Sequence, residues 1–231
     1  MSAAEHDAKL VHEAVAGLGT DERALAEVLC TISDRAMLAL HEAYPRVYQK
    51  SLVDDVKGEW INGDLKKLLL AVMNRCKAPE ASHGPAQVDA DALYKAGEGK
   101  WGTDENTFVR IFGTRSRRQL AEINTAYTAK YGHTLQKAVQ KEFSGHLKWA
   151  LWFLVEPPHL YFASKMREAM AGLGSDKDTM TEVLAFRKDR DLARINEAYV
   201  QAHQKTLLHA FESESSGDYR RLLTAYVRQV V

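Results

Sequence analysis

The stretch GLGTDE at residues 17–22 recurs, with small changes, as KWGTDE at residues 100–105 and as GLGSDK at residues 172–177. Repeated segments of this kind indicate an architecture assembled from similar structural units. Two further features keep the same register, since an Ala-Tyr pair starts 24 residues after the second glycine of each copy and a glutamate follows that glycine by 40 residues. The glutamates are Glu59, Glu142 and Glu214. The chain is therefore built from three copies of one unit.

Each unit has the hydrophobic pattern of amphipathic helices. In the first unit, apolar residues at intervals of three and four share one helix face, and they are Leu25, Val28, Leu29 and Ile32. The threonine or serine after the second glycine is expected to be a helix N-cap, with aspartate in the first turn; these residues are Thr20, Thr103 and Ser175. The turn signals predict about five helices per unit and an all-α fold.

Proline, glycine and serine mark the borders between the units. The segment CKAPEASHGPAQ at residues 76–87 has the composition of a linker, and neither proline of EPPH at residues 156–159 suits a helix interior. We therefore expect repeats at residues 1–75, 88–156 and 157–231, with a linker at residues 76–87.

The composition argues against several classes of function. The 231 residues include 31 Lys plus Arg and 31 Asp plus Glu, so no net basic field favours nucleic acid. None of the nine histidines pairs with Cys30 or Cys76 in a nucleophile arrangement, which argues against an enzyme. Both cysteines are expected to be reduced thiols. Without an apolar leader or a membrane-spanning run, we expect a soluble intracellular protein.

The glycine turn and the distant glutamate form a candidate metal site. A glycine turn at a helix end leaves main-chain carbonyls without intrahelical partners and lets them converge on one point. Calcium takes six to eight oxygen ligands, including carbonyls and a bidentate carboxylate, whereas magnesium demands a smaller and stricter octahedron. A single such turn is equally typical of any helix corner. Three copies in fixed register favour a metal site, because packing does not require an acid at the same place each time.

The residue before the second glycine is apolar in every copy, and these residues are Leu18, Trp101 and Leu173. Leucines buried under the corner would be ordinary packing residues. Tryptophan favours another interpretation, because its amphipathic ring suits the headgroup level of a bilayer.

With these motifs the chain resembles the annexins, calcium-dependent phospholipid-binding proteins built from repeats of five helices. KWGTDE together with FGTRS at residues 112–116 is similar to the third annexin repeat, and MREAMAGLGSD together with SGDYRRLL at residues 216–223 is similar to the fourth. Judged by its linker, the unit at residues 1–75 resembles the second repeat, which leaves no counterpart of the first. The resemblance implies three right-handed superhelical repeats and a cytoplasmic protein that associates reversibly with membranes.

The resemblance further implies one calcium (Ca²⁺) site per repeat, formed by backbone carbonyls and one carboxylate. Oxygens of acidic phospholipid would fill the open coordination positions, so that the ion bridges a neutral protein to an anionic membrane. The implied ligands are the carbonyls of Val15, Gly17 and Gly19 with Glu59, those of Gly97, Lys100 and Gly102 with Glu142, and those of Met170, Gly172 and Gly174 with Glu214. The implied membrane contacts are Leu18, Trp101 and Leu173.

The chain departs from the family pattern in several places. The family core normally has four repeats, and its first and fourth repeats pack together, so the last repeat here would expose an apolar face. We hypothesise self-association or a further N-terminal portion. Arg115 and Arg187 match an arginine that follows the second helix of family repeats, where the first unit has Ile32. Pro45 falls within the third helix, which we expect to end early or kink.

Two function hypotheses follow. The first is a non-enzymatic, peripheral membrane-binding module whose calcium affinity without membrane is on the order of 10⁻⁴ M or weaker. The second is a scaffold that binds cytoskeletal or other protein partners and has partly degenerate calcium sites. Calcium-dependent co-sedimentation with acidic vesicles distinguishes the two hypotheses.

Overall fold

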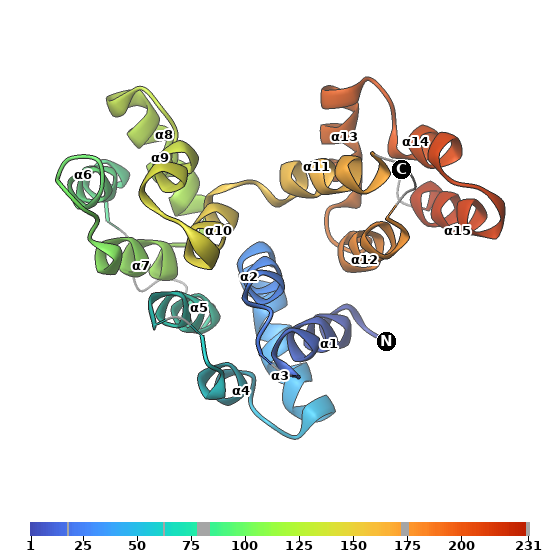
Figure 1. Ribbon diagram of the computed structural model, residues 1–231, viewed down its shortest axis with the longest axis horizontal. Coiled ribbons are helices and arrows are strands. Elements are labelled where there is room, and N and C mark those ends of the chain that lie inside the picture. The colour runs from blue at the N-terminus through green and yellow to red at the C-terminus, as the bar shows by residue number, and fades with distance from the viewer. Residues whose placement is uncertain (18, 62, 78–83, 172–175, 230–231) are drawn as a thin grey trace. The chain divides into compact units, whose positions relative to one another are not determined.

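A computed structural model of the chain describes residues 1–17, 19–61, 63–77, 84–171 and 176–229. Within these ranges it contains fifteen α-helices and no strand (Figure 1). The all-α fold and the five helices per repeat expected from the sequence are confirmed. None of the described helices is long and apolar enough to cross a membrane.

The helices follow one another in three sets of five. The first set is α1 (Ala3–Val15), α2 (Glu22–Thr31), α3 (Asp34–Tyr48), α4 (Leu52–Gly58) and α5 (Gly63–Arg75). The second set is α6 (Ala86–Ala96), α7 (Glu105–Thr114), α8 (Arg117–Tyr131), α9 (Leu135–Glu142) and α10 (Gly145–Val155). The third set is α11 (Pro158–Met170), α12 (Lys177–Arg187), α13 (Leu192–His203), α14 (Leu207–Glu214) and α15 (Gly217–Arg228).

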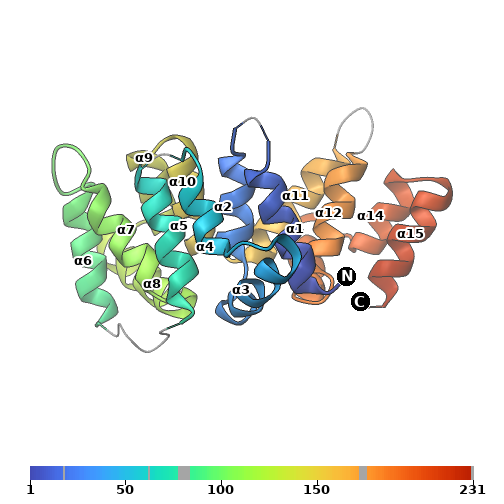
Figure 2. The ribbon, with the colours of Figure 1, turned by 90° about the horizontal axis from the view of Figure 1, so that it is seen from below.

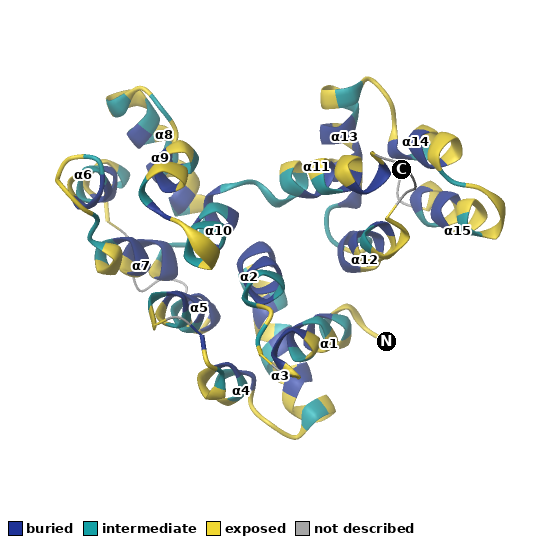
Figure 3. Cartoon of the chain, viewed as in Figure 1, coloured by how far each residue is buried: buried dark blue, intermediate teal, exposed yellow. Residues whose placement is uncertain are grey.

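The chain divides into two compact units, Met1–Glu156 and Pro157–Val231. The first unit holds the first two repeats, which join where α5 packs on α7 and α2 packs on α10 (Figure 2). Gly113 of α7 allows the close approach to α5, because a Cβ atom at this position would lie 2.5 Å from Cβ of Ala71. The buried face of each helix is turned toward its neighbours within the unit (Figure 3).

The second helix of each repeat begins one residue later than the sequence predicted. The side chain of Asp21 accepts the N–H of Ala24, that of Asp104 accepts the N–H of Thr107, and Asp176 caps α12 in the same way. The aspartates are therefore the N-caps, and the assignment to Thr20 and Thr103 was wrong. The physical reason is that each threonine hydroxyl donates its hydrogen bond elsewhere, as described below. Ser175 lies outside the described residues.

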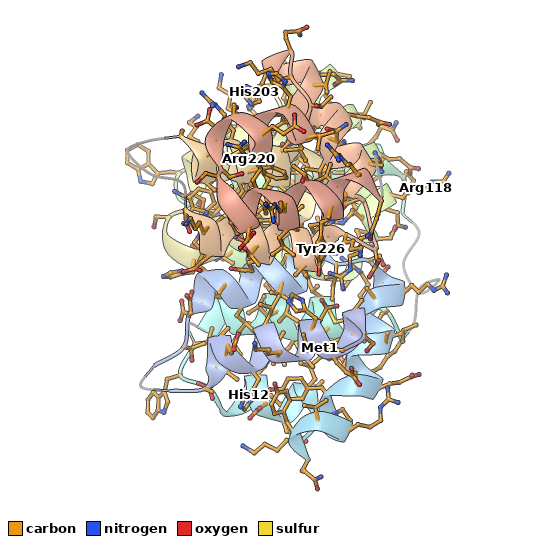
Figure 4. All side chains as sticks on the ribbon, turned by 90° about the vertical axis from the view of Figure 1, so that its right-hand side faces the viewer. Met1, His12, Arg118, His203, Arg220 and Tyr226 are labelled. Carbon is orange, nitrogen blue, oxygen red and sulfur yellow. The ribbon has the colours of Figure 1, made fainter. Side chains whose placement is uncertain are left out.

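Pro45 does not end α3 early, contrary to that part of the sequence-based expectation. The helix continues to Tyr48 and has fifteen residues, as many as its counterpart α8. Pro45 itself is exposed. The last turn is held by packing, since the ring of Tyr48 stacks on His12 of α1 at 3.9 Å and the Tyr44 hydroxyl donates to Asp55 at 2.6 Å. His12 is labelled in Figure 4. Tertiary contacts therefore outweigh the missing backbone hydrogen bond.

The arginines at the end of the second helix, Arg115 and Arg187, are ion-paired. In the second repeat, Arg115 Nε donates to Asp89 Oδ2 at 2.6 Å, and both side chains are almost buried. In the third repeat, Arg187 Nε donates to Asp191 Oδ1 at 2.7 Å. Ile32 takes this position in the first repeat and is buried. The first repeat therefore has a buried apolar residue where the other two repeats have an ion-paired arginine.

Candidate metal centre

The loop between α6 and α7 is closed by a hydrogen bond between its two ends. The backbone N–H of Asp104 donates to the carbonyl of Ala96 at 2.7 Å, and the other repeats repeat this bond, from Asp21 to Ala14 at 2.8 Å and from Asp176 to Ala169 at 2.7 Å. Because this bond spans eight residues in the second repeat and seven residues in the first and third repeats, the α6–α7 loop is one residue longer. The bond brings the end of one helix next to the start of the following helix.

Glu142 lies between the two ends of this loop. The Thr103 hydroxyl donates to Glu142 Oε2 at 2.8 Å. On the other side, a Cβ atom added to Gly97 would lie 3.2 Å from Cγ and 3.4 Å from Cδ of Glu142, so a larger residue there would crowd the glutamate side chain. The structure thus brings Gly97 and Glu142 together across 45 residues of sequence.

The first repeat has the same pairing of a threonine and a glutamate. The Thr20 hydroxyl donates to Glu59 Oε2 at 2.7 Å, and Glu59 is half-buried at the end of α4. The φ angles of Gly17 and Gly19 are 134° and 101°, a region that other residues rarely adopt. A Cβ atom at either glycine would meet nothing within 4 Å, so the backbone conformation, rather than crowding, requires glycine.

The third repeat is described only in part. Gly172, Leu173 and Gly174 lie outside the described residues, as does Leu18 in the first repeat. Met170 is buried at the end of α11, and Glu214 is exposed at the end of α14, where Ser213 Oγ lies 3.5 Å from its Oε1. The ligand set predicted for this repeat and the membrane contacts predicted for the two leucines therefore stay predictions.

The donors near Glu59 and Glu142 fit a hard cation. In the described parts of the chain, no group of three or more His, Cys, Asp or Glu side chains could hold a metal ion. A site here would take most of its ligands from carbonyl oxygens, which suits calcium and not the nitrogen and sulfur ligands typical of zinc. The Lys100 N–H donates to the Gly97 carbonyl at 3.1 Å, and this oxygen keeps a second lone pair for an ion.

Glu98, which the sequence analysis did not identify, anchors the α6–α7 loop to the rest of the second repeat. Its carboxylate accepts hydrogen bonds from Tyr127 Oη at 2.8 Å and Lys141 Nζ at 3.0 Å, and it contacts His133 Nε2 at 2.6 Å. Burial alone would raise the pKa of Glu98, but the hydrogen bonds of Lys141, Tyr127 and His133 outweigh it and lower the pKa to about 2. The ionised and hydrogen-bonded carboxylate of Glu98 therefore restrains the loop backbone next to Gly97.

Two tryptophans are fully exposed at these turns. Trp101 in the α6–α7 loop is fully exposed, and its predicted membrane contact stays a prediction. Trp60 follows Glu59 in the turn between α4 and α5 and is 99% exposed. The sequence analysis did not single out Trp60, although its turn, EWING, is one residue longer than EFSG and ESSG.

Comparison with known proteins agrees with this arrangement. The annexin family profile matches residues 6–72, 88–154 and 161–226. The chain is 38% identical to annexin A13 of Homo sapiens over 226 residues, which cover 96% of the chain and 71% of that protein. It is 36% identical to annexin A7 of Homo sapiens, covering 97% of the chain and 47% of that protein.

Solved structures similar to this chain are also annexins. The structure of annexin III has a TM-score of 0.87 at 33% identity, covering 98% of this chain and 72% of that one. A structure of calcium-bound annexin (Sm)1 has a TM-score of 0.79 at 29% identity, covering 98% and 70%. The chain therefore belongs to the annexin family, a non-enzymatic class whose general activity is calcium-dependent binding to phospholipid membranes.

Proposed function

We propose that this protein binds acidic phospholipid membranes through one calcium site in each of its repeats, at residues 1–75, 88–156 and 157–231. The observation that carries the proposal is the position of Glu142, whose carboxylate lies against Gly97 and accepts a hydrogen bond from Thr103. The pair of Thr20 and Glu59 repeats this contact in the first repeat. By the common register, Glu214 would serve the third site.

In each site, we assign the cation to the space between loop carbonyls and the carboxylate. The ion would coordinate the phosphate oxygens of a lipid. It would also supply positive charge to a chain whose formal net charge is zero. The carbonyls of Gly97, Lys100 and Gly102 are the proposed loop ligands in the second repeat. Trp101, fully exposed at the loop tip, would enter the headgroup region and add apolar contact to the ionic bridge.

Vesicle co-sedimentation tests this function. Vesicles of phosphatidylserine and phosphatidylcholine should sediment the wild-type protein in calcium and release it when a chelator is added. Glu142→Gln keeps the shape of the side chain but loses its charge, and we expect it to raise the calcium concentration needed for half-maximal binding by about tenfold, or about 1.4 kcal/mol.

The matched control is Glu122→Gln in α8, because Glu122 is exposed and pairs with Arg118 in its own helix. This variant should bind like the wild type. Equal binding with calcium and with chelator would contradict the function. Equal calcium requirements for Glu142→Gln and Glu122→Gln would instead contradict the assignment of Glu142.

The apolar groove of the third repeat favours self-association as a second candidate function. Leu184 of α12 and Leu222, Leu223 and Tyr226 of α15 line it, and Leu222 is 48% exposed. The corresponding helices of the first two repeats pack on each other, as α5 on α7 and α2 on α10. Sedimentation velocity of the wild type and of Leu222→Lys tests this candidate, which requires a dimer that the lysine disrupts.

A further inference from the structure

The turn between α4 and α5 contains one residue more than its counterparts. Three residues separate Glu59 from Gly63, whereas two separate Glu142 from Gly145 and two separate Glu214 from Gly217. Because these glycines begin the last helix of each repeat, the extra residue must be accommodated within the turn itself.

The structure identifies which residue is extra. In the second repeat, Phe143 follows the glutamate and is buried, with its ring edge-on to Phe108 at 4.8 Å. In the first repeat, Ile61 is the buried residue, and its N–H donates to the Glu59 carbonyl at 3.0 Å. Ile61 thus takes the place of Phe143, and Trp60 is the additional residue. Because the other two repeats have no residue at this position, the repeat fold does not require an aromatic ring there.

Contacts made by the residues next to Trp60 keep its side chain exposed to solvent. Glu59 is tied inward by the Thr20 hydroxyl, and Ile61 is buried on the other side. Lys66 Nζ donates to the carbonyls of both Lys57 and Glu59, which fixes the backbone before the tryptophan. Trp60 could reach the core only if these contacts broke. The backbone on both sides of the ring is therefore held by hydrogen bonds, so little conformational entropy is lost there when a partner covers the ring.

The surroundings of Trp60 suit a lipid surface better than a protein partner. Among the described neighbours along the chain, the nearest exposed residues are Lys57, Gly58, Gly63 and Lys67, and none of them has an apolar side chain as large as the tryptophan ring. Lys67 Nζ pairs with Asp64 Oδ1 at 2.9 Å. Tryptophans that act as hot spots in protein interfaces are surrounded by further contact residues. A single exposed tryptophan with the exposed Lys57 nearby matches the interface of an acidic bilayer, where the ring lies at headgroup level and an ammonium group meets anionic lipid.

The turn also lies at the membrane-facing end of the proposed sites. The loops α1–α2 and α6–α7 both lie at the upper end of the first unit in Figure 2. The contact between Thr20 and Glu59 joins the α4–α5 turn to the first of these loops. Trp60 and Trp101 therefore belong to the same end of this unit, beside the first and second candidate sites respectively.

We propose that Trp60 is a membrane-contacting residue that enters the headgroup region of an acidic phospholipid bilayer when calcium occupies the site of Glu59. This inference rests on the proposed calcium-dependent membrane binding. In the second repeat the tryptophan comes from the loop that supplies the carbonyls, and in the first repeat it comes from the turn that supplies the carboxylate. The two sites thus place a tryptophan in the membrane from different segments, the loop with the carbonyl ligands in the second repeat and the turn with the carboxylate ligand in the first.

Fluorescence quenching by nitroxide-labelled lipid tests the position of the ring. Trp101→Phe leaves Trp60 together with Trp149 and Trp152, and the double variant Trp60→Phe, Trp101→Phe supplies the emission of those two residues as background. The difference between the two spectra reports Trp60. We expect this difference to shift to the blue and to be quenched by phosphatidylserine vesicles carrying the label near the headgroup, only when calcium is present.

Binding measurements test its contribution. Trp60→Ser should weaken vesicle binding at fixed calcium roughly tenfold, a factor that corresponds to about 1.4 kcal/mol, and Trp60→Phe should lose less. The matched control is Val88→Ser, since Val88 is 61% exposed near the start of α6, away from the α6–α7 loop. Unchanged thermal unfolding of Trp60→Ser would show that the variant is folded.

The outcomes separate this inference from the function on which it rests. If the wild type binds vesicles with calcium but Trp60 is not quenched and Trp60→Ser binds normally, the inference is overturned and the function stands. If the wild type does not bind, both fail. A blue shift that depends on protein concentration without vesicles would assign Trp60 to contact with a second copy and would also overturn the inference.

Discussion

Replacing Thr103 by valine removes one hydroxyl group while keeping the shape of the side chain, and we predict that it weakens calcium binding at the second site. The hydroxyl donates to Glu142 Oε2 at 2.8 Å, and Gly97 limits the space on the other side, since a Cβ atom there would lie 3.4 Å from Cδ of Glu142. Without the hydroxyl, the Glu142 side chain gains rotational freedom that calcium binding must remove again.

The magnitude follows from the entropy of this side chain. Ordering a glutamate costs about 1.5–2 kcal/mol, and we expect loss of one of its two restraints to restore roughly half of that, about 1 kcal/mol. This corresponds to about a fivefold rise in the calcium concentration for half-maximal vesicle binding. The hydrogen bond also stabilises the calcium-free fold by about 1 kcal/mol, so the melting temperature should fall by about 2–4 °C.

Calcium titration of vesicle binding and thermal unfolding in chelator measure the two effects. Thr103→Ser keeps the hydroxyl and should stay close to the wild type. Thr125→Val is the matched control, because the Thr125 hydroxyl donates to the Ala121 carbonyl within its own helix, α8. If Thr103→Val bound calcium as well as the wild type or more tightly, the hydroxyl would compete with the ion instead of positioning the carboxylate.

Three further predictions concern stability and reactivity. Arg115→Leu leaves the buried carboxylate of Asp89 without its ion pair, so urea unfolding should show a loss of about 3–5 kcal/mol; a loss below about 1 kcal/mol would contradict the importance of the pair. Because burial raises the pKa of the Cys30 thiol to about 12, Cys30 should react with a disulfide reagent at pH 8 only after unfolding, and rapid modification of the native protein would refute this. The folded pKa of Glu98, about 2, is below its ordinary value of 4.5, so its contribution is present above pH 4.5 and is lost as the pH falls to about 2. The difference in melting temperature between the wild type and Glu98→Gln should therefore shrink over that range, and a constant difference would show that the charge of Glu98 is not responsible.

Local signals were sufficient to predict most of the fold. The apolar spacing around Leu25 and Leu29 depends only on the period of a helix, and the structure buries both residues in α2. The register of Glu59 and Glu142 with the glycine turns also came from counting alone. It identified carboxylates that the structure places beside the loops in the first two repeats.

Elsewhere, local preferences and tertiary contacts competed. Threonine is a good N-cap in isolation, but Thr20 and Thr103 bond to glutamates from another turn, and the next aspartate caps the helix. Proline disfavours a helix interior, but stacking of His12 on Tyr48 stabilises the turn beyond Pro45. Neither outcome could be predicted without knowing which distant side chains meet.

The sequence by itself determined the number of repeats, their helical nature and the candidate carboxylates, because these depend on periodicity and on fixed spacing along the chain. Only the tertiary structure decided that Glu98 anchors the α6–α7 loop, that Gly97 makes room for Glu142, and that Trp60 is left in water. Those three results depend on contacts between residues far apart in the chain or on the packing of one turn against its repeat. Hydrogen-bond geometry and burial are properties of the packed molecule, which spacing along the chain does not encode.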